Sequence, residues 1–296
     1  MKPNISMAAN RRHWLLSALG SGLGAGLGAF GLPTFAQTTR VAQRPNPKAF
    51  ETGDLVWPKP SGAFVPYAGT DPAKSAVDAL ELREEEWQLL RVQFVRLARA
   101  SAPSLPEVDR VYQLKLAEEV EAMTYSHFVH SYGASVSPGE FQTYGIGQLA
   151  YVGHVAFIDI DATSGDPYVI EAVYGPSLAC KSCVQRVRYA DWLKARGDVL
   201  VWHGRLRNLD GAARQRVVEV ARMQLQKPYQ FFNFDLADAR GFYCSKLVWH
   251  AVHVATGITV DGRSEPRRLI WFSPLQLLNA REHVELLSSP GTYRNA

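Results

Sequence analysis

The sequence predicts an α+β domain in which a small, mostly antiparallel sheet or half-barrel packs against a helix that begins at a cysteine. Three observations carry this prediction. Residues 154–173 hold two strand-like runs, HVAFIDID and YVIEAV, around the turn sequence ATSGDP. Residues 247–255 have apolar side chains at helical spacing directly after Cys244. The segment at about 71–132 is patterned for helices and predicts a helical hairpin inserted into the domain.

The first element is an expected export signal over residues 1–36. Arg11 and Arg12 precede a glycine-rich, weakly apolar stretch, and a small-x-small pattern suits cleavage before Gln37. The paired arginines favour the twin-arginine route, but the usual lysine after the apolar start is missing, which leaves the ordinary secretory route open. So many glycines argue against a retained membrane anchor. We therefore expect a periplasmic or secreted protein with no further membrane span.

Removal of this signal changes the charge of the chain. The formal net charge falls from +4 to +1, because the signal contains Lys2, Arg11 and Arg12 but no acidic residue. The basic pI comes mostly from the signal and therefore gives no reason to expect a nucleic-acid or anionic-membrane partner. Residues 37–52 follow, with three positive charges and two prolines, and predict a flexible leader, so the folded domain is expected over 53–296.

The helical insertion separates the first predicted strand, GDLVWP at 53–58, from HVAFIDID. A first helix is predicted over 71–100, and Ser104 with Glu107 fits a capping box for a second helix. The first helix has a broad apolar stripe, made of Val77, Leu80, Trp87, Leu90 and Phe94. This stripe covers the sheet in the simplest interpretation, but it could also roof an active-site groove.

His154 opens the strand HVAFIDID, where it is expected to be held rigidly near the sheet edge. Glu171 lies inside the apolar run YVIEAV and requires a polar partner there. If the two strands pair with residue 154 opposite 171 or 173, both side chains project from one face and can hydrogen-bond. A register shifted by one residue would point them apart, and a glutamate facing solvent at an edge also remains open.

The chain has three cysteines, and an odd number in an oxidising compartment leaves one thiol unpaired. Cys180 and Cys183 form CKSC in a polar stretch, for which a short structural disulfide is the favoured interpretation. A redox dithiol and a zinc site remain alternatives, although no second ligand pair is evident. If these two cysteines pair with each other, Cys244 is the free one.

Cys244 is predicted to stand at the start of a helix of about three turns that ends before Gly257. The backbone N–H groups at such a position lower the pKa of a thiol and can donate to an oxyanion, which is what a cysteine nucleophile needs. The alternative is a small buried side chain without chemistry.

The other histidines carry weaker patterns. His127 with His130, and His250 with His253, form HxxH pairs without an evident third ligand, and we expect all four on solvated helix faces. His203 and His283 lie beside predicted strands with no distinctive context, and His13 leaves with the signal.

Taken together, these segments resemble a known family. PYQFFNF at 228–234 and FYCSKLV at 242–248 are similar to segments of NlpC-type papain-like cysteine peptidases, as are GDLVWP and HVAFI at 154–158. Here the strands precede the cysteine, so the order is circularly permuted, as in the YiiX-like branch. The segments SPLQLLNA and HVELL resemble the last helix and the last strand of that branch. The resemblance covers about 53–67 and 140–290 and implies a permuted papain-like hydrolase domain.

The resemblance also implies roles for individual residues. Cys244 would be the nucleophile, His154 the general base, and Glu171 the residue that orients the imidazole. Tyr229 matches a family tyrosine placed near the oxyanion. No metal or organic cofactor is required by this chemistry.

Three functions are compatible with this pattern. The first is an exported cysteine amidase or peptidase acting through a thioester, plausibly on cell-wall peptides or peptidoglycan fragments. The second is an acyltransferase or lipid-amide hydrolase acting on acyl amides, for which nearby aromatics would suit an acyl chain: Tyr229, Phe231, Phe232, Phe234, Phe242 and Tyr243. The third is a binding protein of the same fold without turnover.

Overall fold

The structure is a computed structural model that describes residues 44–60, 84–128, 153–197 and 199–288. The chain divides into two compact units, Met1–Arg40 and Val41–Ala296, and every described residue belongs to the second. The predicted export signal therefore lies outside the described residues. Within them, no helix combines the length and apolar composition that a membrane crossing needs.

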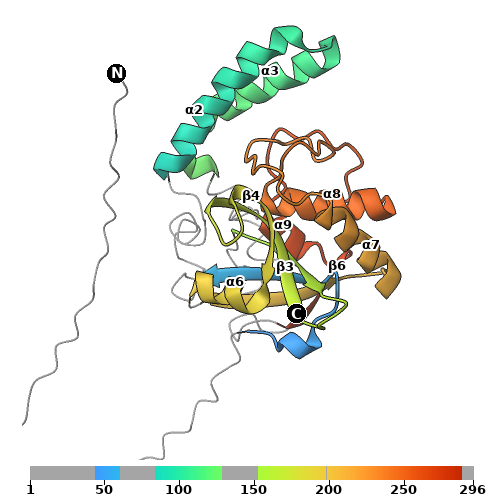
Figure 1. The fold of residues 1–296 in the computed structure, drawn as a ribbon. Coiled ribbons are helices and arrows are strands. Elements are labelled where there is room, and N and C mark those ends of the chain that lie inside the picture. The colour runs from blue at the N-terminus through green and yellow to red at the C-terminus, as the bar shows by residue number, and fades with distance from the viewer. Residues whose placement is uncertain (1–43, 61–83, 129–152, 198, 289–296) are drawn as a thin grey trace, which may run out of the picture. The chain divides into compact units, whose positions relative to one another are not determined.

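One six-stranded antiparallel sheet forms the centre of the second unit (Figure 1). Its strands are β1 (Leu55–Pro60), β2 (Ala156–Ile160), β3 (Pro167–Pro176), β4 (Lys181–Arg188), β5 (Val199–Leu206) and β6 (Val284–Ser288). Their order is β4-β3-β2-β1-β5-β6, with β4 and β6 at the two edges, so the described residues form an open sheet. The α+β fold with an antiparallel sheet is confirmed, in its open form.

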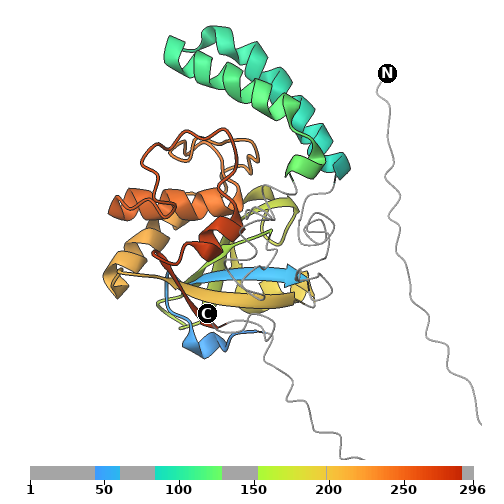
Figure 2. The ribbon, with the colours of Figure 1, turned by 180° about the vertical axis from the view of Figure 1, so that it is seen from behind.

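The described residues also form α-helices and two 3₁₀ helices. They are η1 (Pro47–Ala49), α2 (Glu84–Ser101), η2 (Ala102–Ser104), α3 (Glu107–Ala122), α6 (Tyr189–Arg196), α7 (Gly211–Arg222), α8 (Cys244–Thr256) and α9 (Pro274–Asn279). α7 and α8 lie side by side on one face of the sheet, and α6 lies on the other (Figures 1 and 2).

Alternating strand residues supply two apolar cores, one on each face of the sheet. Leu55 and Trp57 of β1 belong to the larger core, together with α7, α8 and α9, whereas Val56 belongs to the smaller core beneath α6. Because both faces are covered, the strands contain almost continuous apolar runs instead of a simple alternation. This explains why HVAFI carries apolar side chains in both directions.

The end of the predicted leader is ordered, which differs from the prediction. Phe50 is buried in the smaller core, with its ring centroid 4.9 Å from that of Tyr189 and 4.9 Å from that of His203. Arg44 donates to the carbonyl oxygens of Gly197 and Val199, at 2.9 and 3.2 Å. The flexible leader predicted over 37–52 is therefore wrong for residues 44–52, because one aromatic side chain and one arginine attach this segment to the body.

The carboxylate of Asp54, close to this segment in the chain, is buried and ionically paired. Asp54 accepts hydrogen bonds from His203 Nε2 at 2.7 Å, from Arg205 Nε at 2.6 Å and from the backbone N–H of Glu51 at 2.8 Å. Burial by itself raises the pKa of Asp54, but the hydrogen bonds from His203 and Arg205 outweigh it, so that the pKa lies below its ordinary value.

We expect Asp54→Asn to lower the free energy of unfolding at pH 7 by about 3 kcal/mol, because it leaves Arg205 without its buried counter-ion. A carboxyl whose pKa is depressed in the folded state stabilises the fold above its unfolded pKa and loses this effect as the pH falls through the folded pKa. The difference between wild type and variant should therefore shrink below about pH 4. Urea unfolding at pH 7 and pH 3 measures it, with Glu118→Gln on the exposed face of α3 as the control.

The helical insertion is present in its described part as the antiparallel pair α2 and α3. Trp87 is fully buried and Phe94 packs against Phe232, with ring centroids 5.2 Å apart, whereas Val77 and Leu80 lie outside the described residues. The Tyr112 hydroxyl donates to the carbonyl oxygen of Arg268 at 2.9 Å. In the described residues, these contacts join the helical pair to the segments that flank α8.

The predicted capping box at the start of α3 is wrong. The residue before the helix is Pro106, which has no side-chain oxygen. Ser104 instead ends η2, and its hydroxyl donates to the carbonyl oxygen of Ser101 at 2.7 Å. The proline already fixes the backbone that leads into the helix, so the serine takes part in the preceding turn.

Candidate active site

Cys244 is the first residue of α8, as the sequence predicts. The helix ends at Thr256, and Gly257 follows with φ +75°, the left-handed conformation that glycine favours after a helix. Cys244 is buried and takes no part in a disulfide. Its position at the helix start places the sulfur at the positive end of the helix dipole.

The thiol lies beside the residue that precedes His154. Cys244 Sγ donates to the carbonyl oxygen of Gly153 at 3.9 Å, and the peptide bond of that carbonyl leads directly into His154. The start of α8 and the segment just before β2, which contains His154, therefore meet, although they are far apart in the sequence. No layer of core separates the cysteine from the histidine backbone.

His154 and Glu171 form a buried hydrogen-bonded pair. His154 Nε2 lies 2.7 Å from Glu171 Oε2, and both side chains are nearly inaccessible to solvent. Phe157 pairs with Ile170 across β2 and β3, a register that, continued toward the strand start, sets residue 154 opposite 173. This is one of the two registers that place both side chains on one face. Because Nε2 bonds to the carboxylate, Nδ1 is the ring nitrogen that could exchange a proton with a thiol.

Three further side chains bind the Glu171 carboxylate, and no sequence pattern indicated them. Gln185 Nε2 donates to Oε1 at 2.7 Å, while Trp192 Nε1 and Arg196 Nη2 each donate to Oε2 at 2.8 Å. Burial alone raises the pKa of Glu171, but the positive charge of Arg196 and the hydrogen bond with His154 outweigh it and hold the pKa far below its usual range. The carboxylate is thus ionised and fully paired in the interior.

Tyr229 is joined through its backbone to the segment that precedes Cys244. Its N–H donates to the carbonyl oxygen of Ser182 at 2.8 Å, and it forms a bridge with Phe242, two residues before Cys244. The ring centroid lies 5.7 Å from that of Tyr174. The structure therefore brings the Tyr229 backbone next to the segment that leads into α8.

Cys180 and Cys183 form a disulfide at the start of β4, with their Cα atoms 6.1 Å apart. The backbone of Cys183 also forms an isolated antiparallel β-bridge with Pro228, the neighbour of Tyr229. The amide oxygen of Gln185, two residues further on, accepts from the backbone N–H of Ala179 at 3.0 Å. The disulfide loop thus contacts both Gln185, which binds Glu171, and the Tyr229 segment.

The structure corrects the expectation for two histidines. His250 is buried, with Nδ1 3.2 Å from the carbonyl oxygen of Leu236, so it does not lie on a solvated face. His203, which the sequence left without a distinctive context, is the buried partner of Asp54. His127 is exposed, His253 is half-buried, and His130 lies outside the described residues. A loop that returns over α8 covers His250, which the helical pattern of α8 alone could not indicate.

The sequence patterns also did not indicate a second buried titratable group, which lies close to Cys244 in the chain. Lys246, two residues after Cys244, is fully buried, and its Nζ has no hydrogen-bond partner among the described residues. Burial lowers the pKa of Lys246 to about 7. The ammonium lies 5.5 Å from the ring centroid of Phe242.

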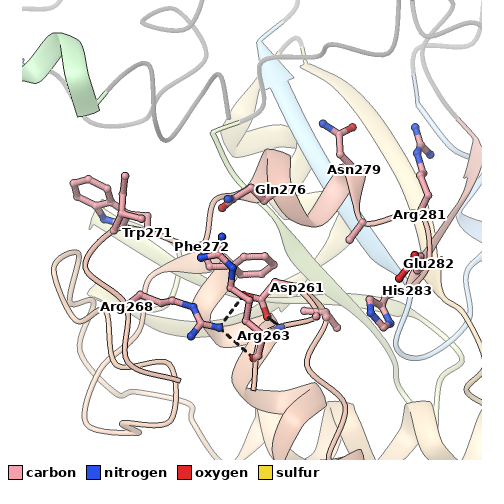
Figure 3. A pocket seen from close by; sticks show the side chains of 14 residues that line it. Asp261, Arg263, Arg268, Trp271, Phe272, Gln276, Asn279, Arg281, Glu282 and His283 are labelled. Carbon is pink, nitrogen blue, oxygen red and sulfur yellow. Dashed lines mark hydrogen bonds and ion pairs between the residues drawn. The ribbon is translucent and has the colours of Figure 1, made fainter. Parts of the chain in front are cut away.

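A pocket of about 540 Å³ lies elsewhere, between α9 and the loop that follows α8 (Figure 3). Its charged lining combines both signs: Asp261, Arg263, Arg268, Arg281, Glu282 and His283. Arg268 is held by the Asp261 carboxylate at 2.9 Å and by the carbonyl oxygen of Arg263 at 3.2 Å. None of the predicted site residues lines this pocket, so it is distinct from the Cys244 site.

The described residues contain no group of three or more histidine, cysteine, aspartate or glutamate side chains that could hold a metal ion. At the site, a buried thiol lies beside the backbone of a histidine that is hydrogen-bonded to a carboxylate. This arrangement suits nucleophilic acyl transfer.

Comparisons with known proteins found a family match and a similar solved structure. Residues 128–279 match the model of a family described as permuted papain-like amidase enzyme, YaeF/YiiX, C92 family. A crystal structure of the metalloprotein yiiX from Escherichia coli O157:H7 is 19% identical, with 53% of this chain and 93% of that chain covered and a TM-score of 0.36. A comparison with curated proteins gives no match. The family match spans just over half of the 296 residues and includes all four predicted site residues, and the chain therefore belongs to the YaeF/YiiX family of permuted papain-like amidases, which are cysteine hydrolases.

Proposed function

We propose that this hydrolase cleaves amide bonds through a thioester on Cys244, with His154 as the general base and Glu171 as the residue that orients it. The observation that carries the proposal is the 3.9 Å contact between Cys244 Sγ and the carbonyl of Gly153, while the next residue, His154, binds Glu171 at 2.7 Å. A cysteine nucleophile needs such a base within reach and a third group behind the base.

The reaction proceeds in two halves. In the first, Sγ attacks the carbonyl carbon of the amide while His154 Nδ1 takes the thiol proton, and the C–N bond breaks as the imidazolium gives that proton to the leaving amine. In the second, water attacks the thioester, His154 takes a proton from the water, and the thiolate leaves and recovers that proton. The products are an amine, a carboxylic acid and the free enzyme.

Glu171 and the start of α8 support the charges that form during these steps. The carboxylate fixes Nε2 as the protonated nitrogen, so that Nδ1 remains available to the thiol, and it stabilises the imidazolium. The backbone N–H of Cys244 at the helix start, with help from Tyr229, would hold the developing oxyanion. No metal or organic cofactor is needed for these reaction steps.

Export and a cell-wall substrate belong to the same proposal. The signal pattern in residues 1–36 and the Cys180–Cys183 disulfide are both typical of a protein that folds in an oxidising compartment. In the periplasm or outside the cell, the abundant amide substrates include the peptides of peptidoglycan.

The aromatic segment before α8 does not favour the acyl-chain alternative. Five of its side chains are at most 5% exposed and pack in the larger core: Phe231, Phe232, Phe234, Phe242 and Tyr243. Rings that are occupied in core packing are not available to line an acyl groove. The substrate test below decides between amide hydrolysis of cell-wall peptides and the acyltransferase or lipid-amide hydrolase activity.

We expect iodoacetamide to label Cys244 rapidly near neutral pH, and we expect His154→Ala to slow the reaction at least about tenfold, because the imidazolium that stabilises the thiolate is removed. Since Cys180 and Cys183 are joined, mass spectrometry reports Cys244 alone. His127→Ala, on an exposed position, is the matched control. Equal labelling rates in wild type and His154→Ala would argue against an activated pair and favour a non-catalytic protein of this fold.

The substrate class is tested directly. The chain without residues 1–36 is incubated with peptidoglycan fragments and, separately, with N-acyl amides, and the products are compared by mass spectrometry with those of Cys244→Ala. New peptide termini that depend on Cys244 support the proposal. Release of fatty acid, or its transfer to an amine, would assign the acyl-amide function instead.

A further inference from the structure

Arg196 occupies an unusual place for a cation beside a catalytic base. It is the last residue of α6, and its Nη2 donates at 2.8 Å to Glu171 Oε2, the same oxygen that lies 2.7 Å from His154 Nε2. Its guanidinium lies over the ring of Trp192, 4.8 Å from the centroid, and Trp192 Nε1 donates to that oxygen as well. The side chain of Arg196 is 18% exposed, so water screens this ion pair only weakly.

We infer that Arg196 is a positioning residue of this enzyme, which holds Glu171 ionised and fixed and sets the pH range in which His154 and Cys244 exchange a proton. The inference rests on the proposed function, because it assigns a role to Arg196 only through Glu171 and His154. Arg196 itself touches neither the thiol nor the reacting atoms in this scheme.

The argument begins with the cost of burying a carboxylate. Glu171 is 1% exposed, and an isolated ionised carboxylate at such a position would either take up a proton or bind the imidazolium so strongly that His154 could not release its proton. Arg196 offsets the charge, while Gln185 and Trp192 supply neutral hydrogen bonds. Glu171 can then orient the imidazole without trapping it in the charged state.

The charged and titratable groups around the Glu171–His154 pair come from several elements. Arg196 is contributed by α6, and Cys244 is contributed by α8. The neighbour from β4, Gln185, is neutral. Arg196 is a cation in direct contact with the Glu171 carboxylate, and its removal changes the local charge by one full unit.

The sign of the effect follows from this charge. Loss of a nearby positive charge favours the protonated forms of both the imidazole and the thiol, so thiolate should form only at higher pH. If Glu171 takes up a proton in the variant, the imidazolium loses its support and thiolate formation again moves to higher pH. Both responses shift the alkylation profile in the same direction.

The test is the rate of iodoacetamide alkylation of Cys244 as a function of pH. We expect the midpoint of this profile to move up by about 1 pH unit in Arg196→Gln and to stay near the wild-type position in Arg196→Lys, which keeps the charge. Arg188→Gln, on an exposed arginine of β4 that does not bind Glu171, should leave the midpoint unchanged. A midpoint that stays in place or falls in Arg196→Gln overturns the inference.

Two further measurements keep this result interpretable. Arg196→Met preserves the apolar stem over Trp192 and replaces Arg196→Gln if that variant melts below the assay temperature. If the proposed function itself is wrong, the alkylation profile of wild-type Cys244 will not change in His154→Ala. If only the role of Arg196 is wrong, wild type will show a His154-dependent midpoint that charge removal at position 196 does not move.

Discussion

Alanine at position 244 is expected to abolish amide hydrolysis, with kcat/KM falling by about 10⁴-fold or more. The reason is that the acyl group must be carried by an atom at the start of α8, and no other side chain in the proposed mechanism can form the thioester. The oxyanion donors would remain, so only the weak catalysis that they provide alone should persist. Initial rates on the substrate that the fragment screen identifies measure the effect.

The same variant should fold normally. Cys244 is 2% exposed, and loss of its sulfur leaves only a small cavity, so thermal unfolding should shift by no more than a few degrees. Ser245→Ala is a matched control, because its buried hydroxyl donates to the carbonyl oxygen of Phe272 and has no part in the proposed chemistry. Hydrolysis that survives in a well-folded Cys244→Ala protein would show that the nucleophile lies elsewhere.

Local sequence patterns predicted the elements that carry the site. The apolar spacing after Cys244 and the glycine at 257 defined α8, and the turn between the HVAFIDID and YVIEAV runs defined the β2–β3 hairpin. These signals are short-range: a helical period, a turn sequence and a left-handed glycine act over a few residues. The hydrogen bond between His154 and Glu171 was predictable only as a condition on register, which the hairpin satisfies.

The environment of Glu171 was not predictable in the same way. Gln185, Trp192 and Arg196 converge on it from β4 and α6, and no local period links these positions to residue 171. The sequence showed only that a carboxylate in an apolar strand requires a partner. Which partner it takes depends on the packing of α6 against the sheet, which is a tertiary property.

Two of the wrong predictions, those for His250 and Phe50, have the same origin. His250 was assigned to a solvated face because an isolated helix exposes the side opposite its apolar stripe, but α8 is buried along most of its length. Phe50 was placed in a flexible leader because the surrounding charges and prolines resemble a disordered segment, yet a single aromatic side chain reaches the smaller core. In both cases long-range burial overrides a correct local pattern.

Glutamine at position 171 is expected to lower kcat/KM by about 10³-fold, although the substitution barely changes the size of the side chain. The native carboxylate accepts hydrogen bonds on both oxygens, from Gln185 on Oε1 and from Trp192 and Arg196 on Oε2, where it also meets His154. A glutamine has one oxygen and one NH₂ group. Whichever way it turns, one N–H group faces another donor.

Each orientation of that glutamine damages the site in a definite way. If its NH₂ group faces His154, the imidazole must protonate Nδ1 instead of Nε2, and Nδ1 can no longer accept the thiol proton. If the NH₂ group faces Gln185, that amide must rotate and lose its bond from Ala179, and Arg196 still lacks a counter-ion. We expect a loss of about 3 kcal/mol in the free energy of unfolding to accompany the lower activity.

Steady-state kinetics and urea unfolding, with Glu119→Gln on exposed α3 as the control, separate the two effects. A Glu171→Gln enzyme with kcat/KM close to wild type would mean that His154 keeps its working tautomer without the carboxylate, and the assignment of Glu171 would then fail.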